Sequence, residues 1–175
     1  GVHGDLPLSI RRQRQMCIRD RLKHTEIKHH NALLYHLPED QISFTALPSE
    51  TFERLKLRTD GHAKPITILL DDEPIGFFVL DYGDDKLEMT NNTNSLLLRS
   101  LSINPEFQGK GYGKISMNLM DDFVKDNFPT IDELVLAVNF KNKSAYDLYL
   151  KVGYIDDGSQ REWFNEMQHL LRKKI

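Results

Sequence analysis

A glycine-rich stretch at 104–113, directly after an apolar run at 95–103, carries the clearest chemical signal in this chain. It holds three glycines at alternate positions, Gly109, Gly111 and Gly113. Without Cβ atoms the backbone approaches a ligand closely, and a helix that begins here points its free N–H groups at an anion. Lys110 and Lys114 add positive charge beside these groups. The pattern indicates a phosphate or pyrophosphate site, although the loop alone favours an ordinary strand-to-helix turn.

A second segment, 139–154, follows the next apolar run and changes that balance. Gln108-x-x-Gly111-x-Gly113 resembles the acyl-CoA pyrophosphate motif of the GCN5-related N-acetyltransferase (GNAT) family, Q/R-x-x-G-x-G/A. The later segment resembles the second motif of that family through Asn142-x-x-Ala145-x-x-Leu148-Tyr149-x-x-x-Gly153-Tyr154. The order, the spacing and the strand expected between them agree. The resemblance is specific over 95–155 and concerns only the general architecture elsewhere.

The resemblance implies an α/β (α+β) fold, in which helices flank a mixed, splayed central β-sheet of about six to seven strands. It also implies an N-acetyltransferase that uses acetyl-CoA as the acyl-donor cosubstrate. The acetyl group would pass to a primary amine of a small molecule by direct attack in a ternary complex. The alternatives are a protein or peptide amine as acceptor, and a non-catalytic acyl-CoA sensor.

The residues that would hold acetyl-CoA also follow from the resemblance. In the family the strand before the loop pairs with the pantetheine arm, so a backbone N–H near Ser102 or Ile103 would face the thioester oxygen. The implied cofactor-binding set is Leu101, Ser102, Ile103, Gln108, Gly109, Lys110, Gly111, Tyr112, Gly113, Lys114, Asn139, Asn142 and Tyr146. Two members have simpler explanations, because Asn142 suits a helix N-cap and Tyr146 suits packing.

Tyr149 occupies the position at which the family usually has its general acid. A departing thiolate resembles cysteine, with a pKa of about 8.5, and a phenol with a pKa of about 10 can supply its proton. The competing interpretation is a core aromatic residue with a satisfied hydroxyl. The matched motif favours the catalytic role.

The strand before the loop departs from a frequent family pattern. Many relatives carry an acidic residue there, whereas this chain has Arg99 and Ser100. Glu88 or a relay of water molecules is therefore considered as the base that removes the amine proton. Arg99 is a candidate substrate-binding residue that orients an acceptor carboxylate, or it pairs with a buried acid.

Composition narrows the class of protein. The chain has 175 residues, a net charge of −3, and 28% charged and 9% aromatic residues, which is typical of a globular domain. No apolar run reaches the ~18 residues that span a bilayer. Cysteine and histidine show no metal-ligand spacing. We therefore predict a cytoplasmic enzyme with no metal, membrane or nucleic-acid partner, and we leave a homodimer open.

Residues 1–21 form a basic tail, with five arginines against two aspartates and a local charge of +3. A nucleic-acid arm or a transit peptide is conceivable, but 12–21 also resembles translated sequencing-adaptor read-through. We interpret the tail as non-native or disordered and place the single acyltransferase domain at 22–175. The only cysteine, Cys17, falls within the tail and says little about the redox compartment.

The remaining elements follow from periodicity and turn residues. In the first half we expect a strand at 22–30, mostly helix at 31–60 with a helix from Ser49 to Gly61, a hairpin from 66–70 and 75–80, and a strand end at 86–90. In the second half we expect strands at 95–103 and 134–138, helices after Gly113 and from Asn142, and a last antiparallel strand at 162–171. Four acidic residues of the helical region lie where the family commonly forms its acceptor cleft, Glu39, Asp40, Glu50 and Glu53. They favour a cationic amine, although a solvated helix face explains them more simply.

Overall fold

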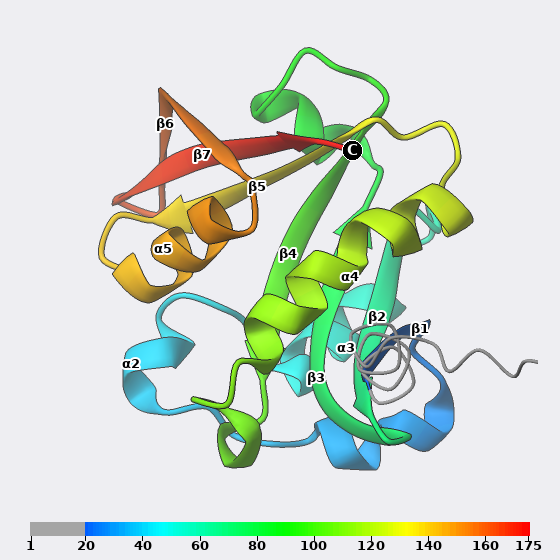
Figure 1. Ribbon diagram of the computed structural model, residues 1–175. Coiled ribbons are helices and arrows are strands. Elements are labelled where there is room, and N and C mark those ends of the chain that lie inside the picture. Colours follow the sequence, from blue (N-terminus) through cyan, green and yellow to red (C-terminus); the bar gives the residue numbers. More distant parts are fainter. Residues whose placement is uncertain (1–19) are drawn as a thin grey trace, which may run out of the picture.

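The computed structural model describes residues 20–175, which fold around one seven-stranded sheet in the order β1-β2-β3-β4-β5-β7-β6 (Figure 1). The strands are β1 Asp20–His24, β2 Ala63–Leu70, β3 Glu73–Asp81, β4 Ser95–Ile103, β5 Glu133–Asn139, β6 Ile155–Trp163 and β7 Glu166–Lys174. The helices are α2 Glu39–Ile42, α3 Pro48–Lys56, α4 Tyr112–Asn127 and α5 Lys143–Lys151. Short 3-10 turns occupy Ile27–His29, Asn31–Leu33, Asp84–Glu88 and Pro105–Phe107.

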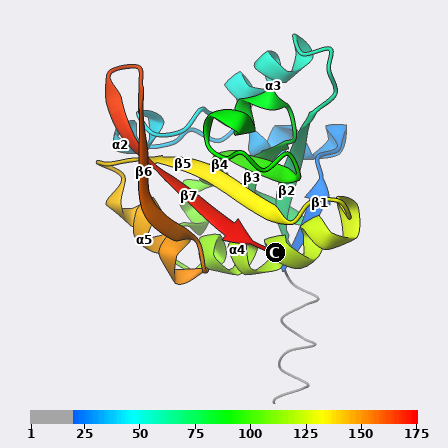
Figure 2. The same cartoon turned by 90° about the horizontal axis from the view of Figure 1, so that it is seen from above.

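The sheet is mixed, because β4 and β5 run parallel while all other neighbouring strands run antiparallel. Figure 2 shows α4 and α5 on one side of the sheet and α3 on the other. The crossover from β4 through α4 to β5 is the βαβ unit that a parallel pair requires. Within this unit the loop 104–111 connects the end of β4 to the start of α4.

Apolar side chains from both faces of the sheet account for this layering. On one face α4 buries Met117, Met120 and Val124 against strand residues such as Leu96 and Leu134. On the other face a smaller cluster joins Leu33, Phe52, Phe77 and Val79. Because β3, β4 and β5 are covered on both faces, their sequences read as nearly continuous apolar runs.

Several element boundaries differ from those expected. The strand expected at 162–171 is a hairpin of two strands, β6 and β7, whose turn has positive φ at Phe164 (49°) and Asn165 (62°). The strand end expected at 86–90 is a 3-10 turn, in which buried Lys86 donates a hydrogen bond to the Tyr82 carbonyl at 3.1 Å. Polar, mostly exposed residues form β6, so its alternation of apolar and polar residues is weak.

The N-terminal third is less helical than expected. β1 ends at His24 and two 3-10 turns follow, so the strand expected at 22–30 is too long. Residues 31–60 contain only the two short helices α2 and α3. The second of them starts at Pro48 rather than after Ser49, and it ends at Lys56, well before Gly61.

The tail predicted at 1–21 lies largely outside the described residues. Its last two members do not belong to a tail, because Asp20 and Arg21 form the start of β1 and pair with Leu70 and Leu69. The Arg21 side chain also forms an ion pair with Asp72. The strand β1 therefore includes two residues that the sequence analysis placed in the tail.

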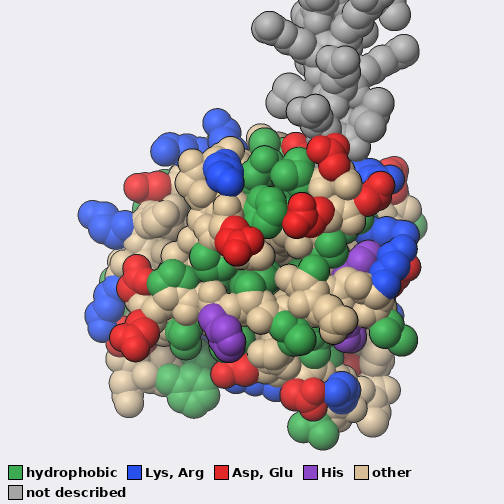
Figure 3. Space-filling view, turned by 90° about the horizontal axis from the view of Figure 1, so that it is seen from below, with side chains coloured by type: hydrophobic (Ala, Val, Ile, Leu, Met, Phe, Trp, Pro, Cys, Tyr) green, Lys and Arg blue, Asp and Glu red, His purple; other side chains and the backbone are tan. Residues whose placement is uncertain are grey.

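The surface carries charge of both signs. Acidic and basic side chains are interspersed over the face in Figure 3, with apolar side chains between them. Within 20–175 no helix combines the length and the apolar character needed to cross a bilayer. The same residues contain no group of three or more His, Cys, Asp or Glu side chains arranged to hold a metal ion.

Candidate active site

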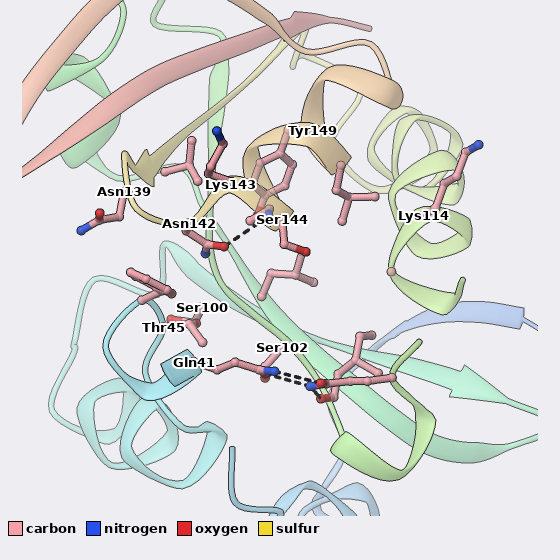
Figure 4. A pocket seen from close by; sticks show the side chains of 18 of the residues that line it. Gln41, Thr45, Ser100, Ser102, Lys114, Asn139, Asn142, Lys143, Ser144 and Tyr149 are labelled. Carbon is pink, nitrogen blue, oxygen red and sulfur yellow. Dashed lines mark hydrogen bonds between the residues drawn. The ribbon is translucent and has the colours of Figure 1, made fainter. Parts of the chain in front are cut away.

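A cleft of about 840 Å³ opens where β4 and β5 separate. The residues that line it come from five segments, although not every residue of each takes part: 40–45 from α2 and the residues after it, 98–103 from β4, 107–114 from the glycine loop, 137–139 from β5, and 141–149 from the start of α5. In Figure 4 α2 and α5 lie on opposite sides of this space. The two matched sequence motifs thus face one cavity.

The separation of β4 and β5 creates free hydrogen-bonding groups. The two strands pair only from Ser95–Leu97 to Glu133–Val135, and the β4 residues beyond Leu97 have no partner in β5. The unpaired part contains a β-bulge, because Val79 and Phe77 of β3 oppose Arg99 and Ser102, which leaves an extra residue in β4. Ser100 in this bulge has a φ of 57°. A bulge bends its strand, and this one lies just beyond Leu97, the last β4 residue that pairs with β5.

The glycine loop has the geometry of an anion cradle. Gly109 (φ 71°) and Gly111 (φ 86°) adopt the left-handed conformation that side chains disfavour, and a Cβ at either position meets nothing within 4 Å. These glycines are therefore explained by backbone conformation and open space, not by packing within the chain. Gly111 caps α4, a helix of 16 residues whose first turn contains Lys114. Its first N–H groups and its dipole favour a phosphate at this place.

Gln108, the first residue of the loop motif, lies at a junction of three walls of the cleft. Its side-chain amide exchanges two hydrogen bonds with Gln41 of α2, each 2.9 Å long (Figure 4). The same Nε2 donates to the carbonyl of Ile103 at 2.8 Å, where β4 ends. Both side chains are partly buried.

Tyr149 lies in the wall of the cleft on α5, where it is only 8% exposed (Figure 4). Asn142 starts this helix, and its Oδ1 accepts a hydrogen bond from the Ala145 N–H at 3.2 Å. Burial raises the pKa of the Tyr149 hydroxyl well above its usual value. The group therefore stays protonated at neutral pH, as a general acid for a thiolate must. Its ring packs edge-on against Tyr154, with centroids 5.5 Å apart.

Most of the predicted cofactor residues line the cleft. They are Leu101, Ser102, Ile103, Gln108, Gly109, Gly111, Tyr112, Gly113, Lys114, Asn139 and Asn142. Two predicted residues do not: Lys110 donates to the Glu106 carbonyl at 2.9 Å, and the Tyr146 hydroxyl donates to Asp156 at 2.9 Å. Asn139 and Asn142 each use their side-chain oxygen to cap a nearby backbone N–H.

Arg99 lines the cleft and also pairs with a buried acid. Its Nη1 lies 2.9 Å from Asp81, which is 1% exposed, and 3.1 Å from Asp85. Burial opposes ionisation of Asp81, but hydrogen bonds from Arg58, the Gly83 N–H and Arg99 outweigh it and lower the pKa of this carboxyl. Of the two roles considered for Arg99, the ion pair is present, and the contact with an acceptor stays a prediction.

Glu88, which the sequence analysis considered as the base, lies outside the cleft. It forms an ion pair with Arg161 at 2.9 Å and is well exposed. Of the four acidic residues in the helical region, only Asp40 lines the cleft. Asp40 is exposed, and it has no ion-pair partner among residues 20–175.

Sequence patterns did not identify several residues of this site. Gln41, Phe44 and Thr45 belong to the α2 wall, and the Thr45 hydroxyl is buried without a hydrogen-bond partner among the described residues. Tyr35 lies behind β4, where its hydroxyl bonds to Ser102 Oγ at 2.8 Å. No periodicity marks these positions, because they come from short, irregular segments. Only the approach of α2 to β4 in the folded chain makes them neighbours of the motif residues.

Comparison with known proteins identifies the class. The sequence model of the acetyltransferase (GNAT) family matches residues 31–154. The uncharacterized N-acetyltransferase YbbJ of Bacillus subtilis (strain 168) is 42% identical over 135 residues, which is 72% of this chain and 83% of that protein. The chain therefore belongs to the GNAT family, as its two motifs predicted.

Solved structures support the same fold. The aminoglycoside acetyltransferase AAC(6')-Ib in complex with coenzyme A and kanamycin superposes with a TM-score of 0.70 at 17% identity, over 89% of this chain and 94% of that one. Spermidine N-acetyltransferase from Vibrio cholerae, in complex with CoA and spermine, gives 0.60 at 18% identity, over 89% and 95%. The mixed, splayed sheet is thus confirmed. The family makes this protein an acetyl-CoA-dependent N-acetyltransferase, as predicted.

Proposed function

We propose that the protein transfers the acetyl group of acetyl-CoA to a primary amine of a small molecule, by direct attack in a ternary complex. The observation that carries this proposal is the meeting of three features in one cleft. These are the unpaired edge of β4, the glycine loop at the start of α4, and Tyr149 on α5. A phosphate-binding loop, a strand edge for an extended arm and a protonated phenol are together what acetyl transfer from a thioester requires.

Each part of the cleft has a task in this mechanism. The N–H groups at Gly109–Gly113 hold the pyrophosphate, and Lys114 adds positive charge. The unpaired edge at Leu101–Ile103 holds the pantetheine arm, and an N–H near Ser102 polarises the thioester carbonyl. The amine nitrogen then forms a bond to the carbonyl carbon, and the carbon–sulfur bond breaks. Tyr149 gives its proton to the departing sulfur, and water carries away the proton of the amine.

The α2 wall supports a cationic acceptor. Asp40 lines the cleft without an ion-pair partner among the described residues, so it offers a charge to an ammonium group. Thr45 also lines the cleft, and its buried hydroxyl has no hydrogen-bond partner in the described part of the chain. The aminoglycoside acetyltransferase and the spermidine N-acetyltransferase of similar fold are in complex with kanamycin and spermine, so small molecules with several amino groups are the first acceptors to test. A cytoplasmic location is part of the proposal, and a homodimer stays a prediction.

The decisive experiment measures thiol release from acetyl-CoA with a panel of amines. The panel contains spermine, kanamycin, single amino acids and a peptide with a free amino terminus. We expect release to be stimulated by a small polyamine more than by the peptide. Binding of CoA without stimulation by any amine would favour the sensor alternative, and failure to bind CoA would reject the proposal.

A further inference from the structure

The wall of the cleft at residues 39–46 is attached weakly to the rest of the molecule. Four of its residues line the cleft, Asp40, Gln41, Phe44 and Thr45. None of the eight residues is buried. The helix α2 within it is a single turn of four residues. A segment with so little buried surface needs other contacts to keep one position.

Gln41 supplies those contacts. Within residues 20–175 the other hydrogen bonds of this wall are local, such as those from the Ile42 N–H to the Pro38 carbonyl and from the Thr45 N–H to the Gln41 carbonyl. The Ser43 hydroxyl likewise bonds to the Asp40 carbonyl. The paired amides of Gln41 and Gln108, both 2.9 Å, are the hydrogen bonds that join the wall to another segment. In Figure 4 the two dashed lines from the labelled Gln41 mark these bonds.

The paired amides of Gln41 and Gln108 connect the wall to the glycine loop and to the end of β4, the two elements proposed to bind the acetyl donor. Gln108 begins the glycine loop, and its Nε2 also donates to the Ile103 carbonyl at 2.8 Å. The position of the wall is therefore tied to the loop and to the last residue of β4. A ligand that fixes the loop also fixes Gln108. Besides its bond to the Ile103 carbonyl, the Gln108 amide forms hydrogen bonds only with Gln41 among the described residues.

We propose that Gln41 is a positioning residue that couples donor binding to the acceptor wall. CoA bound at the glycine loop fixes the position of Gln108. Gln108 in turn fixes Gln41 through their paired amides, and Gln41 keeps residues 39–46 in the geometry that binds the amine. The coupling is reciprocal, so an acceptor on the wall also strengthens CoA binding. The inference rests on the proposed function for the location of CoA.

The size of the effect follows from the two bonds. A pair of neutral hydrogen bonds, partly buried, corresponds to a change of about 5- to 140-fold in the equilibrium between a held and a released wall. A leucine at position 41 is of similar bulk, one bond shorter and without an amide, so it removes both bonds. A glutamate still accepts the bond from Gln108 Nε2, but it loses the donated bond and sets a carboxylate oxygen against Gln108 Oε1, so it keeps only part of the link.

Hydrogen exchange with and without coenzyme A tests the coupling and needs no acceptor. In the wild-type protein we expect saturating coenzyme A to slow exchange both at 108–114 and at 39–46. In Gln41→Leu the slowing at 108–114 should persist, while that at 39–46 should disappear and basal exchange there should rise about 5- to 140-fold. Gln41→Glu should restore part of the response. Ser43→Ala, in the same wall but bonded only within it, is the matched control and should behave as the wild type.

The outcomes separate this inference from the proposed function. No slowing at 108–114 in the wild type would reject the CoA site itself. Slowing at 108–114 without any at 39–46 would overturn the coupling and leave the CoA site in place. A coenzyme A response at 39–46 that survives in Gln41→Leu would show that another contact carries it, and would also overturn the role of Gln41. The wild-type comparison decides even if a variant fails to fold.

Discussion

Replacing Tyr149 with phenylalanine separates its two interpretations, because the change deletes one hydroxyl and keeps the ring. The hydroxyl has no hydrogen-bond partner among residues 20–175, and the edge-on contact with Tyr154 at 5.5 Å belongs to the ring. Removing this hydroxyl therefore breaks no hydrogen bond within the described chain and leaves the packing of the ring in place. We therefore expect the free energy of unfolding of Tyr149→Phe to stay equal or to rise.

Catalysis should respond in the opposite direction. Loss of a positioned general acid lowers the rate by about 10²–10⁴-fold. Neither the glycine loop nor β4 is altered, so the affinity for acetyl-CoA should stay near that of the wild type. The expected result is a lower kcat, with unchanged cofactor binding and no loss of stability.

The pH dependence sharpens this test. Burial raises the pKa of Tyr149 above its usual value, so its hydroxyl stays protonated and able to donate throughout the neutral range. Loss of the donor matters most where the leaving thiolate needs a proton, below the thiol pKa of about 8.5. The ratio of wild-type to Tyr149→Phe turnover should therefore be largest at low pH and should shrink as pH rises above that value.

Tyr154→Phe is the matched control. Tyr154 is also buried, its hydroxyl also lacks a hydrogen-bond partner among the described residues, and its ring faces the same contact, but it does not line the cleft. The assay is thiol release from acetyl-CoA with an amine that the panel identifies, measured over pH for all three proteins. Equal turnover of Tyr149→Phe and wild type, or an equal loss in Tyr154→Phe, would refute the acid role and return Tyr149 to the core.

Three further predictions concern the loop, the boundary and the buried acid. Gly111→Val should abolish acetyl-CoA binding in calorimetry, whereas Gly61→Val, at a similar positive φ of 68° with open space around it, should bind normally. Equal affinities would remove the loop from the site. A chain that begins at Asp20 should keep the melting temperature and cofactor binding of the full chain, and a large loss of either would place 1–19 in the fold. Asp81→Ala removes the buried partner of Arg58 and Arg99, which are partly exposed and keep Asp60 and Asp85, and it should cost about 1–3 kcal/mol of stability at pH 7 in urea unfolding. Because the pKa of Asp81 is lowered, its contribution is present above the unfolded pKa of about 3.9 and is lost as pH falls through the folded value. A mutational cost that stays unchanged down to pH 2 would contradict this.

The sequence by itself determined the parts of the site whose signals are local. Gly109 and Gly111 have the positive φ that their residue type allows, and Asn142 caps the helix that it was expected to start. The runs at 95–103 and 134–138 form largely buried strands, because a strand covered on both faces buries every side chain of a continuous apolar run. These features lie within about ten residues of the chain, so their causes are visible in a short window.

Other features depend on contacts between distant segments, and only the tertiary structure decided them. The separation of β4 from β5 is accompanied by a bulge around Ser100, which is defined only by the pairing of β4 with β3. Arg99 meets a buried carboxylate 18 residues away, and Gln41 meets Gln108 across 67 residues. The β6 strand has an exposed, polar sequence and exists because β7 supplies its hydrogen bonds. No local pattern encodes such partners, since each side chain is satisfied by a group that the fold brings to it.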